Sequence, residues 1–238
     1  MEIPHRIRSY VLRAGRITAA QERALGQLWP SYGLDATAAL DLDAVFARRA
    51  PRCLEIGFGA GEVIGALAER NPHIDYLGIE VHRSGVGRLL LHAERAGLAN
   101  LRVICRDAVE VLRDALTDAS LDEVLVFFPD PWHKKRHHKR RLIEPVFIAQ
   151  LARKLRPDGV LRLATDWQDY AAQMLAVCNV EPLLESLSVD RTFVARPPFR
   201  PPTRFERRGE RLGHGVWDLA YRRPGAEPGR DAGPGRDG

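Results

Sequence analysis

The 238-residue sequence contains no apolar stretch long enough to span a lipid bilayer. Its start, Met1–Arg16, is polar and basic and lacks the apolar segment of a secretory signal. Cysteine is scarce: there are three, Cys53, Cys105 and Cys178, and no two of them form a CxxC pair. Because all three lie inside apolar runs, we interpret them as reduced core thiols rather than as metal ligands or disulfides. We therefore expect a cytoplasmic protein with no membrane partner.

The composition is typical of a single α/β domain. Hydrophobic residues make up 45% of the chain, which is enough to bury a sizeable core, and charged residues make up 28%. The net charge is only +5, but six lysines and arginines fall between His133 and Arg141. Such clustering indicates a polyanionic partner more strongly than the total charge does. The chain shows no internal repeat.

Short apolar runs alternate with amphipathic stretches along the middle of the chain. We predict strands at residues 52–57, 75–81, 101–105, 121–128 and 160–165, and an edge strand at 216–221. Helices are predicted at residues 62–70, 84–96, 108–115, 143–155 and 167–177, and Pro157-Asp158-Gly159 ends the fourth of them. Strands that alternate with helices indicate a parallel sheet covered on both faces.

The two ends of the chain differ from this middle part. We expect residues 1–30 to form a basic, extended N-terminal arm, because they carry few periodic apolar residues. Residues 31–223 would form the α/β domain. Residues 224–238 are rich in Gly, Pro, Arg and Asp and cannot bury apolar surface, so we predict a disordered tail.

A glycine-rich turn follows the first predicted strand. It reads Glu55-Ile-Gly57-Phe-Gly59-Ala-Gly61 and opens a helix. Glycines let the backbone pass close to a ligand, and a helix N-terminus favours electronegative groups. A similar turn is used in NAD sites, and the pattern also fits a tight turn without any ligand. The turn alone therefore does not identify a cofactor.

Acidic residues stand near the ends of three successive predicted strands. Glu55 comes two residues before the first glycine, Glu80 ends the second strand, and Asp107 follows the third. A carboxylate at the end of the second strand can accept both hydroxyls of a ribose. Three acids suit a cationic sulfonium ligand and disfavour an anionic pyrophosphate. Each acid has a second explanation, the capping of the helix after its strand, and for Asp107 that explanation is a serious competitor.

The most informative segment, Phe127–Arg141, follows the fourth predicted strand and reads FFPDPWHKKRHHKRR. In open α/β sheets, ligands bind outside the carboxyl ends of the strands, so this segment faces the same crevice as the glycine turn. Two prolines bracket Asp130 and restrict its backbone, which is typical of a site residue. Lysine and arginine neutralise phosphates, which favours RNA over the alternative of a solvated charge run. Trp132 would either stack on a base or pack under the loop.

The histidines of this segment do not predict a metal site. His133, His137 and His138 lie among six cations, whereas a metal needs neutral or anionic ligands, so we expect no metal. Two further segments add polar residues. Thr165-Asp166-Trp167 ends the fifth strand at the same edge, and residues 203–209 (TRFERRG) follow a proline-rich loop. Residues 203–209 also fit a plain surface turn.

These pieces together resemble the bacterial tRNA (guanine-N7-)-methyltransferase family. In the family's order, the matching pieces are Glu55-x-Gly57-x-Gly59-x-Gly61, Gly78-Ile79-Glu80, Asp107-Ala108, Phe128-Pro-Asp-Pro-Trp132, the basic run to Arg141, Thr165-Asp166-Trp167 and Thr203-x-Phe205-Glu206-x-Arg208-Gly209. They cover about residues 10–223. The Pro-Asp-Pro-Trp turn with its basic run is highly specific, whereas the glycine turn is not. His133 stands where many members carry proline, which leaves the loop slightly less rigid.

The resemblance implies a fold and a reaction. The fold would be α/β, a Rossmann-like class I S-adenosylmethionine-dependent methyltransferase with a seven-stranded, mostly parallel sheet and an antiparallel last strand. The cofactor would be S-adenosyl-L-methionine, and the partner would be tRNA. The reaction would place the methyl group on N7 of a guanine in the tRNA variable loop, at position 46. The oligomeric state stays open between monomer and homodimer.

The resemblance also implies residue roles. Asp130 would be the catalytic residue. The methyl donor would be held by Glu55, Gly57, Gly59, Gly61, Glu80, Asp107 and Asp130. The substrate would be held by Lys134, Asp166, Thr203, Arg204, Phe205 and Glu206. RNA would be contacted by Arg136, His137, His138, Lys139, Arg140 and Arg141.

Three other functions compete with this one. A methyltransferase for a protein or a small molecule shares the donor site, and the basic loop argues against a small molecule. A dinucleotide-dependent oxidoreductase is disfavoured by the acids at three strand ends and by the lack of arginine or lysine near the glycine turn. A non-catalytic RNA-binding protein would have no need to retain all of the acids.

Overall fold

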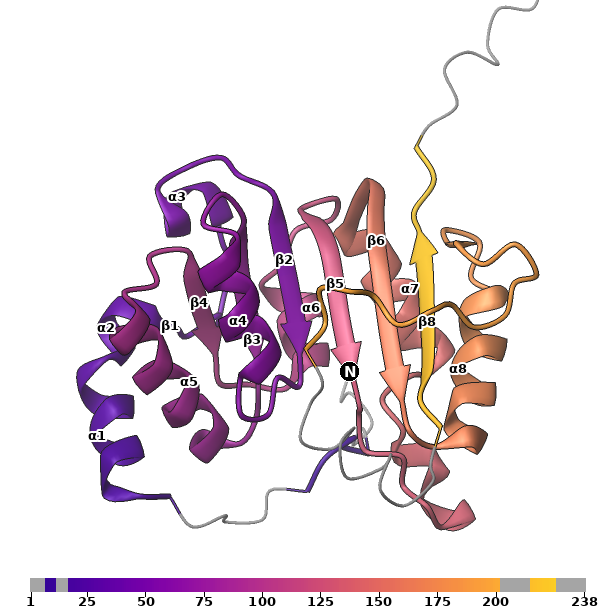
Figure 1. Ribbon diagram of the computed structural model, residues 1–238, viewed down its shortest axis with the longest axis horizontal. Helices are drawn as coiled ribbons and strands as arrows, with labels where there is room; N and C mark the ends of the chain where they lie inside the picture. Colours follow the sequence, from indigo (N-terminus) through magenta and orange to yellow (C-terminus); the bar gives the residue numbers. More distant parts are fainter. Residues whose placement is uncertain (1–6, 12–16, 202–214, 226–238) are drawn as a thin grey trace, which may run out of the picture.

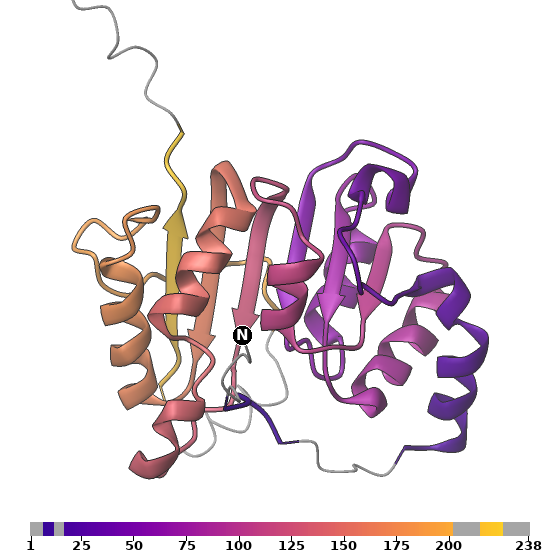
Figure 2. The same ribbon diagram turned by 180° about the vertical axis from the view of Figure 1, so that it is seen from behind.

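The protein is described by a computed structural model, which covers residues 7–11, 17–201 and 215–225. Within these residues, eight strands form one sheet in the order β1-β4-β3-β2-β5-β6-β8-β7, with helices on both faces (Figures 1 and 2). The strands are β1 (Gly33–Leu34), β2 (Arg52–Ile56), β3 (Asp75–Ile79), β4 (Leu101–Ile104), β5 (Leu121–Phe127), β6 (Leu155–Thr165), β7 (Glu185–Ser186) and β8 (Trp217–Arg222). The helices are α1 (Ala19–Gln27), α2 (Trp29–Tyr32), α3 (Leu42–Phe46), α4 (Glu62–Arg70), α5 (Arg83–Ala96), α6 (Ala108–Asp114), the 3₁₀ helix η1 (Lys135–Arg140), α7 (Pro145–Lys154) and α8 (Gln168–Asn179).

The sheet is parallel from β1 to β6 and antiparallel at β8. The β2–β3, β3–β4, β2–β5 and β5–β6 pairs are all parallel. β8 runs the other way and pairs with β6 from Val160↔Arg222 to Thr165↔Trp217. The expected fold class and its antiparallel last strand are therefore confirmed. The sheet has one strand more than the seven expected, because the two-residue β1 adds to the edge beside β4.

Side chains alternate between two apolar layers, as a pleated sheet requires. Leu54 and Ile56 of β2 face the layer that includes α6, α7 and α8. Cys53 faces the layer formed with α1, α4 and α5. Figure 2 shows α7 and α8 in front of the sheet, on the side away from α4 and α5. Both layers bury apolar surface, so each strand of the centre is held from two sides.

The predicted helices agree well with α4 and α5, but the predicted boundary between α7 and β6 is misplaced. The predicted helix at residues 62–70 coincides with α4, and the one at 84–96 begins one residue earlier as α5. The helix predicted at 143–155 is shorter, Pro145–Lys154, because Leu155 already pairs with Leu121 of β5. Between that pair and Glu123↔Val160 the register shifts, and Asp158 adopts a positive φ of 65°. The Pro-Asp-Gly sequence therefore forms an irregularity within β6 and does not precede the strand.

The prediction of an extended N-terminal arm over residues 1–30 is wrong for Ala19–Gln27, which form α1. The side chain of Thr18 caps α1 in a reciprocal capping box with Gln21. α1 then packs so closely on α5 that a Cβ on Gly87 would meet the backbone of Gln21 at 2.9 Å. Ala24, buried in this contact, carries the apolar signal, but one alanine is too weak to be seen in the sequence. The tail beyond residue 225 lies outside the described residues.

The chain between β7 and β8 crosses the front of the sheet over β8, β6 and β5 (Figure 1). Along this crossing Val194 forms a bridge with Asp218 of β8, and Phe199 packs against the apolar layer of α4 and α5. No helix within the described residues is long and apolar enough to cross a membrane.

Candidate active site

Five acids lie in or just beyond the strands at one edge of the sheet. β2, β3, β4, β5 and β6 are parallel, so their carboxyl ends share an edge, which is the lower one in Figure 1. The acids are Glu55, Glu80, Asp107, Asp130 and Asp166. Because ligands of open α/β sheets bind at this edge, the fold brings these five predicted site residues to one side of the molecule.

The glycine turn after β2 adopts a backbone that favours glycine. Gly57, Gly59 and Gly61 have φ values of 73°, 56° and 77°, a region that costs other residues steric strain. A Cβ on Gly57 or Gly59 would meet no atom within 4 Å, whereas one on Gly61 would meet Leu89 at 2.7 Å. The first two glycines therefore border open space that a ligand can use, and the third allows close packing of α4 on α5.

The carboxylate of Glu80 holds this turn together. Its Oε2 accepts a hydrogen bond from Gly59 N at 2.8 Å, and its Oε1 accepts from Val81 N at 2.7 Å and His82 N at 2.9 Å. A carboxylate has about four acceptor positions, so roughly one stays available for a ribose hydroxyl. Glu80 is thus fixed in place before any donor arrives, which is the condition for a preorganised binding group.

Glu55 is a buried carboxyl beside the glycine turn. Its side chain lies in β2, and the residue is 3% exposed. Within the described residues its Oε2 has no hydrogen-bond partner. Burial raises the pKa of Glu55 to about 8, a backbone hydrogen bond at Ile64 lowers it, and the charge of Glu80 raises it further. A buried acid with an unmet acceptor fits a cationic group better than an anionic one.

Asp107 caps α6. Its side chain accepts a hydrogen bond from Val109 N at 2.9 Å, and its backbone has the extended geometry of an N-cap. The capping explanation raised by the sequence is therefore confirmed. The role in holding the methyl donor that the resemblance implies for Asp107 remains a proposal beside it.

Asp130 sits in a turn whose backbone is constrained on both sides. Phe128 and Trp132 have positive φ values of 52° and 49°, which are strained for side chains of this size. Between them, Asp130 Oδ1 accepts a hydrogen bond from Trp132 N at 3.0 Å. The side chain is exposed, so the turn presents a rigidly held carboxylate to solvent at the carboxyl edge.

The basic run after this turn forms η1 and exposes most of its cations. Lys134, Lys135, Arg136 and Lys139 are exposed, and His137 is half-buried. Partial desolvation, followed by the charge of Arg136 and three other cations, lowers the pKa of His137, so it stays neutral at pH 7. The positive charge of the surface therefore comes from lysine and arginine. Within the described residues no three His, Cys, Asp or Glu side chains are placed to hold a metal.

Arg141 differs from the rest of the run because its side chain is only 2% exposed. Its guanidinium donates to Pro131 O at 2.9 Å, Gln173 Oε1 at 2.7 Å and Asp169 Oδ2 at 2.6 Å. It also lies over the ring of Tyr170, 4.7 Å from the centroid. Arg141 therefore holds the Pro-Asp-Pro turn against α8. Its expected contact with RNA stays a prediction, which this burial does not favour.

Aromatic contacts join the two loops that follow β5 and β6. The ring of His133 meets Trp167 edge-on at 4.2 Å between centroids. Trp132 donates from Nε1 to Ser9 O at 3.0 Å and carries Arg140 over its ring at 5.1 Å. Of the two interpretations of Trp132, packing within the loop is the one that the structure supports. The contact with Ser9 also brings the N-terminal segment to this edge.

The remaining predicted substrate residues are placed only in part. Asp166 follows Thr165 of β6 and is half-buried, and Lys134 is exposed beside η1. Thr203, Arg204, Phe205 and Glu206 lie outside the described residues. Sequence reasoning missed two buried charges near this edge, Arg200 and Asp218. The available signal was the aspartate within the otherwise apolar strand Trp217-Asp218-Leu219-Ala220, which the structure places between β6 and β7 and not at the edge predicted from the sequence.

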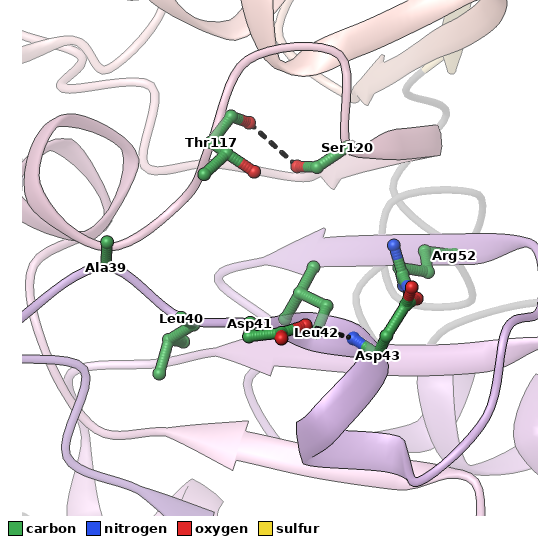
Figure 3. A pocket seen from close by; sticks show the side chains of 8 residues that line it. All are labelled: Ala39, Leu40, Asp41, Leu42, Asp43, Arg52, Thr117 and Ser120. Carbon is green, nitrogen blue, oxygen red and sulfur yellow. Dashed lines mark hydrogen bonds and ion pairs between the residues drawn. The ribbon is translucent and has the colours of Figure 1, made fainter.

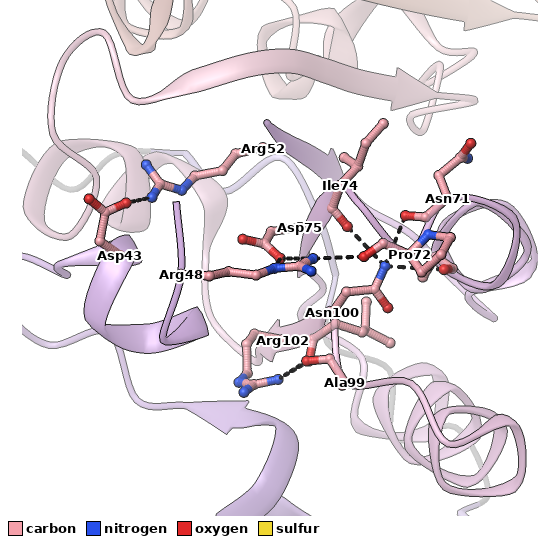
Figure 4. Close-up of polar contacts among 12 residues, drawn as sticks. Asp43, Arg48, Arg52, Asn71, Pro72, Ile74, Asp75, Ala99, Asn100 and Arg102 are labelled. Carbon is pink, nitrogen blue, oxygen red and sulfur yellow. Dashed lines mark hydrogen bonds and ion pairs between the residues drawn. The ribbon is translucent and has the colours of Figure 1, made fainter. Parts of the chain in front are cut away.

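A cavity of about 400 Å³ lies at the opposite, amino edge of the sheet (Figure 3). Its polar lining includes Asp41, which caps α3, and Arg52, which is paired with Asp43. Close by, Arg48 binds the buried Asp75, and Asn100 donates to three backbone carbonyls (Figure 4). These groups fasten the starts of the strands to one another, so we assign this edge to stability.

Comparison with known proteins identifies the family of this chain. A family model described as a putative methyltransferase matches residues 49–219. The tRNA (guanine-N(7)-)-methyltransferase of Methylococcus capsulatus is 57% identical over 220 residues, which cover 92% of this chain and 95% of that protein. The protein of the same name from Leifsonia xyli subsp. xyli is 56% identical over 218 residues, covering 91% and 96%.

Solved structures agree on the fold. The antibiotic-resistance methyltransferase Kmr has a TM-score of 0.52 at 18% identity, covering 77% of this chain and 92% of that one. The 16S rRNA methyltransferase KamB has a TM-score of 0.51 at 15% identity, covering 92% and 99%. At such low identity these likenesses show the fold alone. The identity to the sequence relatives is high and spans nearly the whole chain, and the chain belongs to the tRNA (guanine-N7-)-methyltransferase family.

Proposed function

We propose that this protein transfers the methyl group of S-adenosylmethionine to N7 of a guanine in the variable loop of tRNA. The observation that carries the proposal is a juxtaposition at one sheet edge. A glycine turn with open space and a buried, unmet carboxyl lie on one side, and a rigid exposed carboxylate joined to a basic helix lies on the other.

The residues of the glycine turn fit the donor. Gly57 and Gly59 leave room for a ligand against the backbone. Glu80, with roughly one acceptor position left, would take a ribose hydroxyl, and Glu55 would offer negative charge to a cationic ligand. An NAD pyrophosphate would instead meet the negative charge of these acids, which disfavours the oxidoreductase.

The proposed reaction does not require a strong general base. When bound, S-adenosylmethionine would supply a methyl group on a positively charged sulfur to the in-plane lone pair of guanine N7. As the N7–CH3 bond forms, the S–CH3 bond would break and its electron pair would return to the sulfur, so the donor would leave as a neutral thioether. No proton has to leave N7, so alignment and charge stabilisation provide the rate. Asp130 would accept hydrogen bonds from guanine N1–H and the amino group, and would stabilise the positive charge that forms on the ring.

The exposed cations of η1 would position the RNA. Lys135, Arg136 and Lys139 can each neutralise a phosphate, and Lys134 stands next to the Asp130 turn. A guanine engaged in tertiary pairing has to leave its stack before N7 can be reached, so the enzyme would bind a flipped base. Asp166 and residues 203–206 are proposed to complete the base site.

Nucleoside analysis tests the proposal directly. Purified protein is incubated with unmodified tRNA and isotope-labelled donor, and the tRNA is digested and examined by mass spectrometry. We expect labelled 7-methylguanosine, and oligonucleotide mapping should place it in the variable loop. A different methylated nucleoside, a methylated protein, or binding of NAD as tight as that of the donor would contradict the proposal.

A further inference from the structure

A buried ion pair lies beside the candidate catalytic turn, outside every residue assigned a role so far. Arg200 is fully buried, and its Nη2 lies 2.9 Å and 3.1 Å from the two carboxylate oxygens of Asp218. Asp218 belongs to β8 and is itself 5% exposed. Burying two charges costs several kcal/mol of desolvation each, so the pair adds little stability over apolar residues of the same shape. Its presence therefore needs another reason.

The same guanidinium reaches the end of β5. It lies over the rings of Phe127 and Phe128, 5.3 Å from each centroid. Phe127 is the last residue of β5, and Phe128 is the residue with φ of 52° that turns the chain into Pro129-Asp130-Pro131. Arg200 thus contacts the two phenylalanines that lead into the Asp130 turn.

Arg200 is also fixed within its own segment. Its N–H donates to Pro197 O at 3.1 Å, and its carbonyl accepts from Arg196 Nη2 at 2.6 Å. The preceding Phe199 packs under the guanidinium of Arg162 in β6, at 5.2 Å. One side chain therefore links β8 to the end of β5.

We propose that Arg200 is a positioning residue for methyl transfer, which fixes the Asp130 turn relative to β8 through Asp218 and the two phenylalanine rings. The role rests on the proposed function, because the Asp130 turn belongs to the proposed base site. A planar guanidinium is required, since it lies over both rings while one of its nitrogens contacts the two carboxylate oxygens, whereas an ammonium has no flat face to place on the rings.

Two substitutions separate positioning from stability. Arg200→Lys keeps the charge and loses the planar contact with the two phenylalanine rings. The double variant Arg200→Met with Asp218→Leu replaces the ion pair by apolar residues, an exchange that is often neutral for folding. Arg222→Met is the matched control, because Arg222 also lies on β8 and pairs with an acid, Glu185 at 3.3 Å, but is 46% exposed and stands at the far end of the strand.

Turnover with saturating tRNA and donor is measured per donor-binding site, counted by calorimetry, so that unfolded molecules do not contribute. We expect both Arg200 variants to bind S-adenosylmethionine as tightly as the wild type, and to lose about 10- to 100-fold in kcat per site, as small misplacements of reacting groups do. The control should keep its kcat.

Two results would overturn the role of Arg200. One is an unchanged kcat per site in either variant, and the other is a loss of donor binding together with activity, which would make the pair a general part of the fold. Measuring the wild type in the same assay separates the role of Arg200 from the proposed function. If the wild type modifies no guanine N7, the proposed function fails. If the wild type and the Arg200 variants are equally active, only the positioning role fails.

Discussion

At the residue scale, the candidate site is built from carboxylates whose geometry is set before a ligand binds. Glu80 is held by three backbone N–H groups, and Asp130 by one, within a turn of constrained φ. Such preorganisation means that the groups need not reorient during the reaction, which is where electrostatic stabilisation gains most. The two acids can be tested separately because they would serve different ligands.

Asp130→Asn should remove most of the turnover. The asparagine amide oxygen can still accept from Trp132 N, so the turn should keep its shape while the negative charge disappears. Loss of one preorganised electrostatic group typically costs about 100- to 1,000-fold in kcat. Single-turnover assays with saturating donor and tRNA measure this, with Asp190→Asn as a control in an exposed acid outside the site. Near-full activity of the Asn variant would make Asp130 a loop-shaping residue and move attention to Asp166.

Glu80→Gln should weaken donor binding. A glutamine has one acceptor oxygen in place of two, so at least one of the N–H groups of Gly59, Val81 or His82 loses its partner. The expected loss is roughly 1–3 kcal/mol in the binding free energy of S-adenosylmethionine, the usual cost of an unmet hydrogen bond. Calorimetry should detect it, and Glu94→Gln on the exposed side of α5 serves as the control. Equal affinities would show that Glu80 neither holds the turn nor contacts the donor.

At the element scale, the sequence predicted the positions of the acids better than it predicted the buried arginine and the short strands around them. The acids could be found because parallel strands end at one edge, so strand order alone brings Glu55, Glu80 and Asp130 together. The burial of Arg141 could not be found, because a basic run has no periodicity that sets one arginine apart from its neighbours. The two-residue strands β1 and β7 are too short for any pattern. They exist because neighbouring strands offer them a partner.

The basic run should divide into RNA-binding and anchor residues. Neutralising the exposed Lys135 and Lys139 to glutamine should flatten the slope of log affinity for tRNA against log salt, by roughly 0.7–0.9 for each phosphate that is no longer neutralised. The melting temperature of this double variant should stay that of the wild type. Filter binding at a series of salt concentrations gives the slope. If the slope does not change, η1 is a solvated surface and the RNA binds elsewhere.

Arg141→Gln should behave in the opposite way. It removes donors to Pro131 O and Asp169 and the stacking on Tyr170, so thermal unfolding should occur at a lower temperature. Turnover should fall because the Asp130 turn loses its attachment to α8. The salt slope of tRNA binding should change less than in the lysine variant. A flatter slope with an unchanged melting temperature would restore Arg141 to the RNA-contacting group.

At the scale of the whole molecule, the amino edge of the sheet is assigned to stability, and the carboxyl edge holds the candidate site. The amino edge is fastened by paired charges such as Arg48 with Asp75. At the carboxyl edge lies the buried Glu55, whose Oε2 has no hydrogen-bond partner within the described residues. Burial there raises the pKa of Glu55 to about 8, from an ordinary value of 4.5. The stability of the donor-free protein should therefore depend on pH through this residue.

The sign of that dependence follows from the raised pKa. The folded protein binds the Glu55 proton more tightly than the unfolded chain, so its contribution is fully present below pH 4.5 and is lost as the pH rises to about 8. Glu55→Gln does not titrate. Its free energy of unfolding relative to the wild type should rise between these pH values, by at most about 1.4 kcal/mol per pH unit, and then level off.

Urea unfolding of both proteins across this pH range, without donor, measures the difference. Glu62→Gln, in an exposed acid at the start of α4, is the control and should show no such trend. A constant difference between Glu55→Gln and the wild type would mean that Glu55 is ionised in the folded protein throughout.

The protonation state of the buried Glu55 carboxyl should also depend on which ligand occupies the donor site. A sulfonium cation nearby would favour the ionised form, so at neutral pH we expect a proton to leave for the solvent as the donor binds. The heat of donor binding would then change with the protonation enthalpy of the buffer. The demethylated product carries no sulfonium charge and should release fewer protons. Alkaline conditions should accordingly favour donor over product, so pH would tune how strongly the spent cofactor inhibits the next turnover.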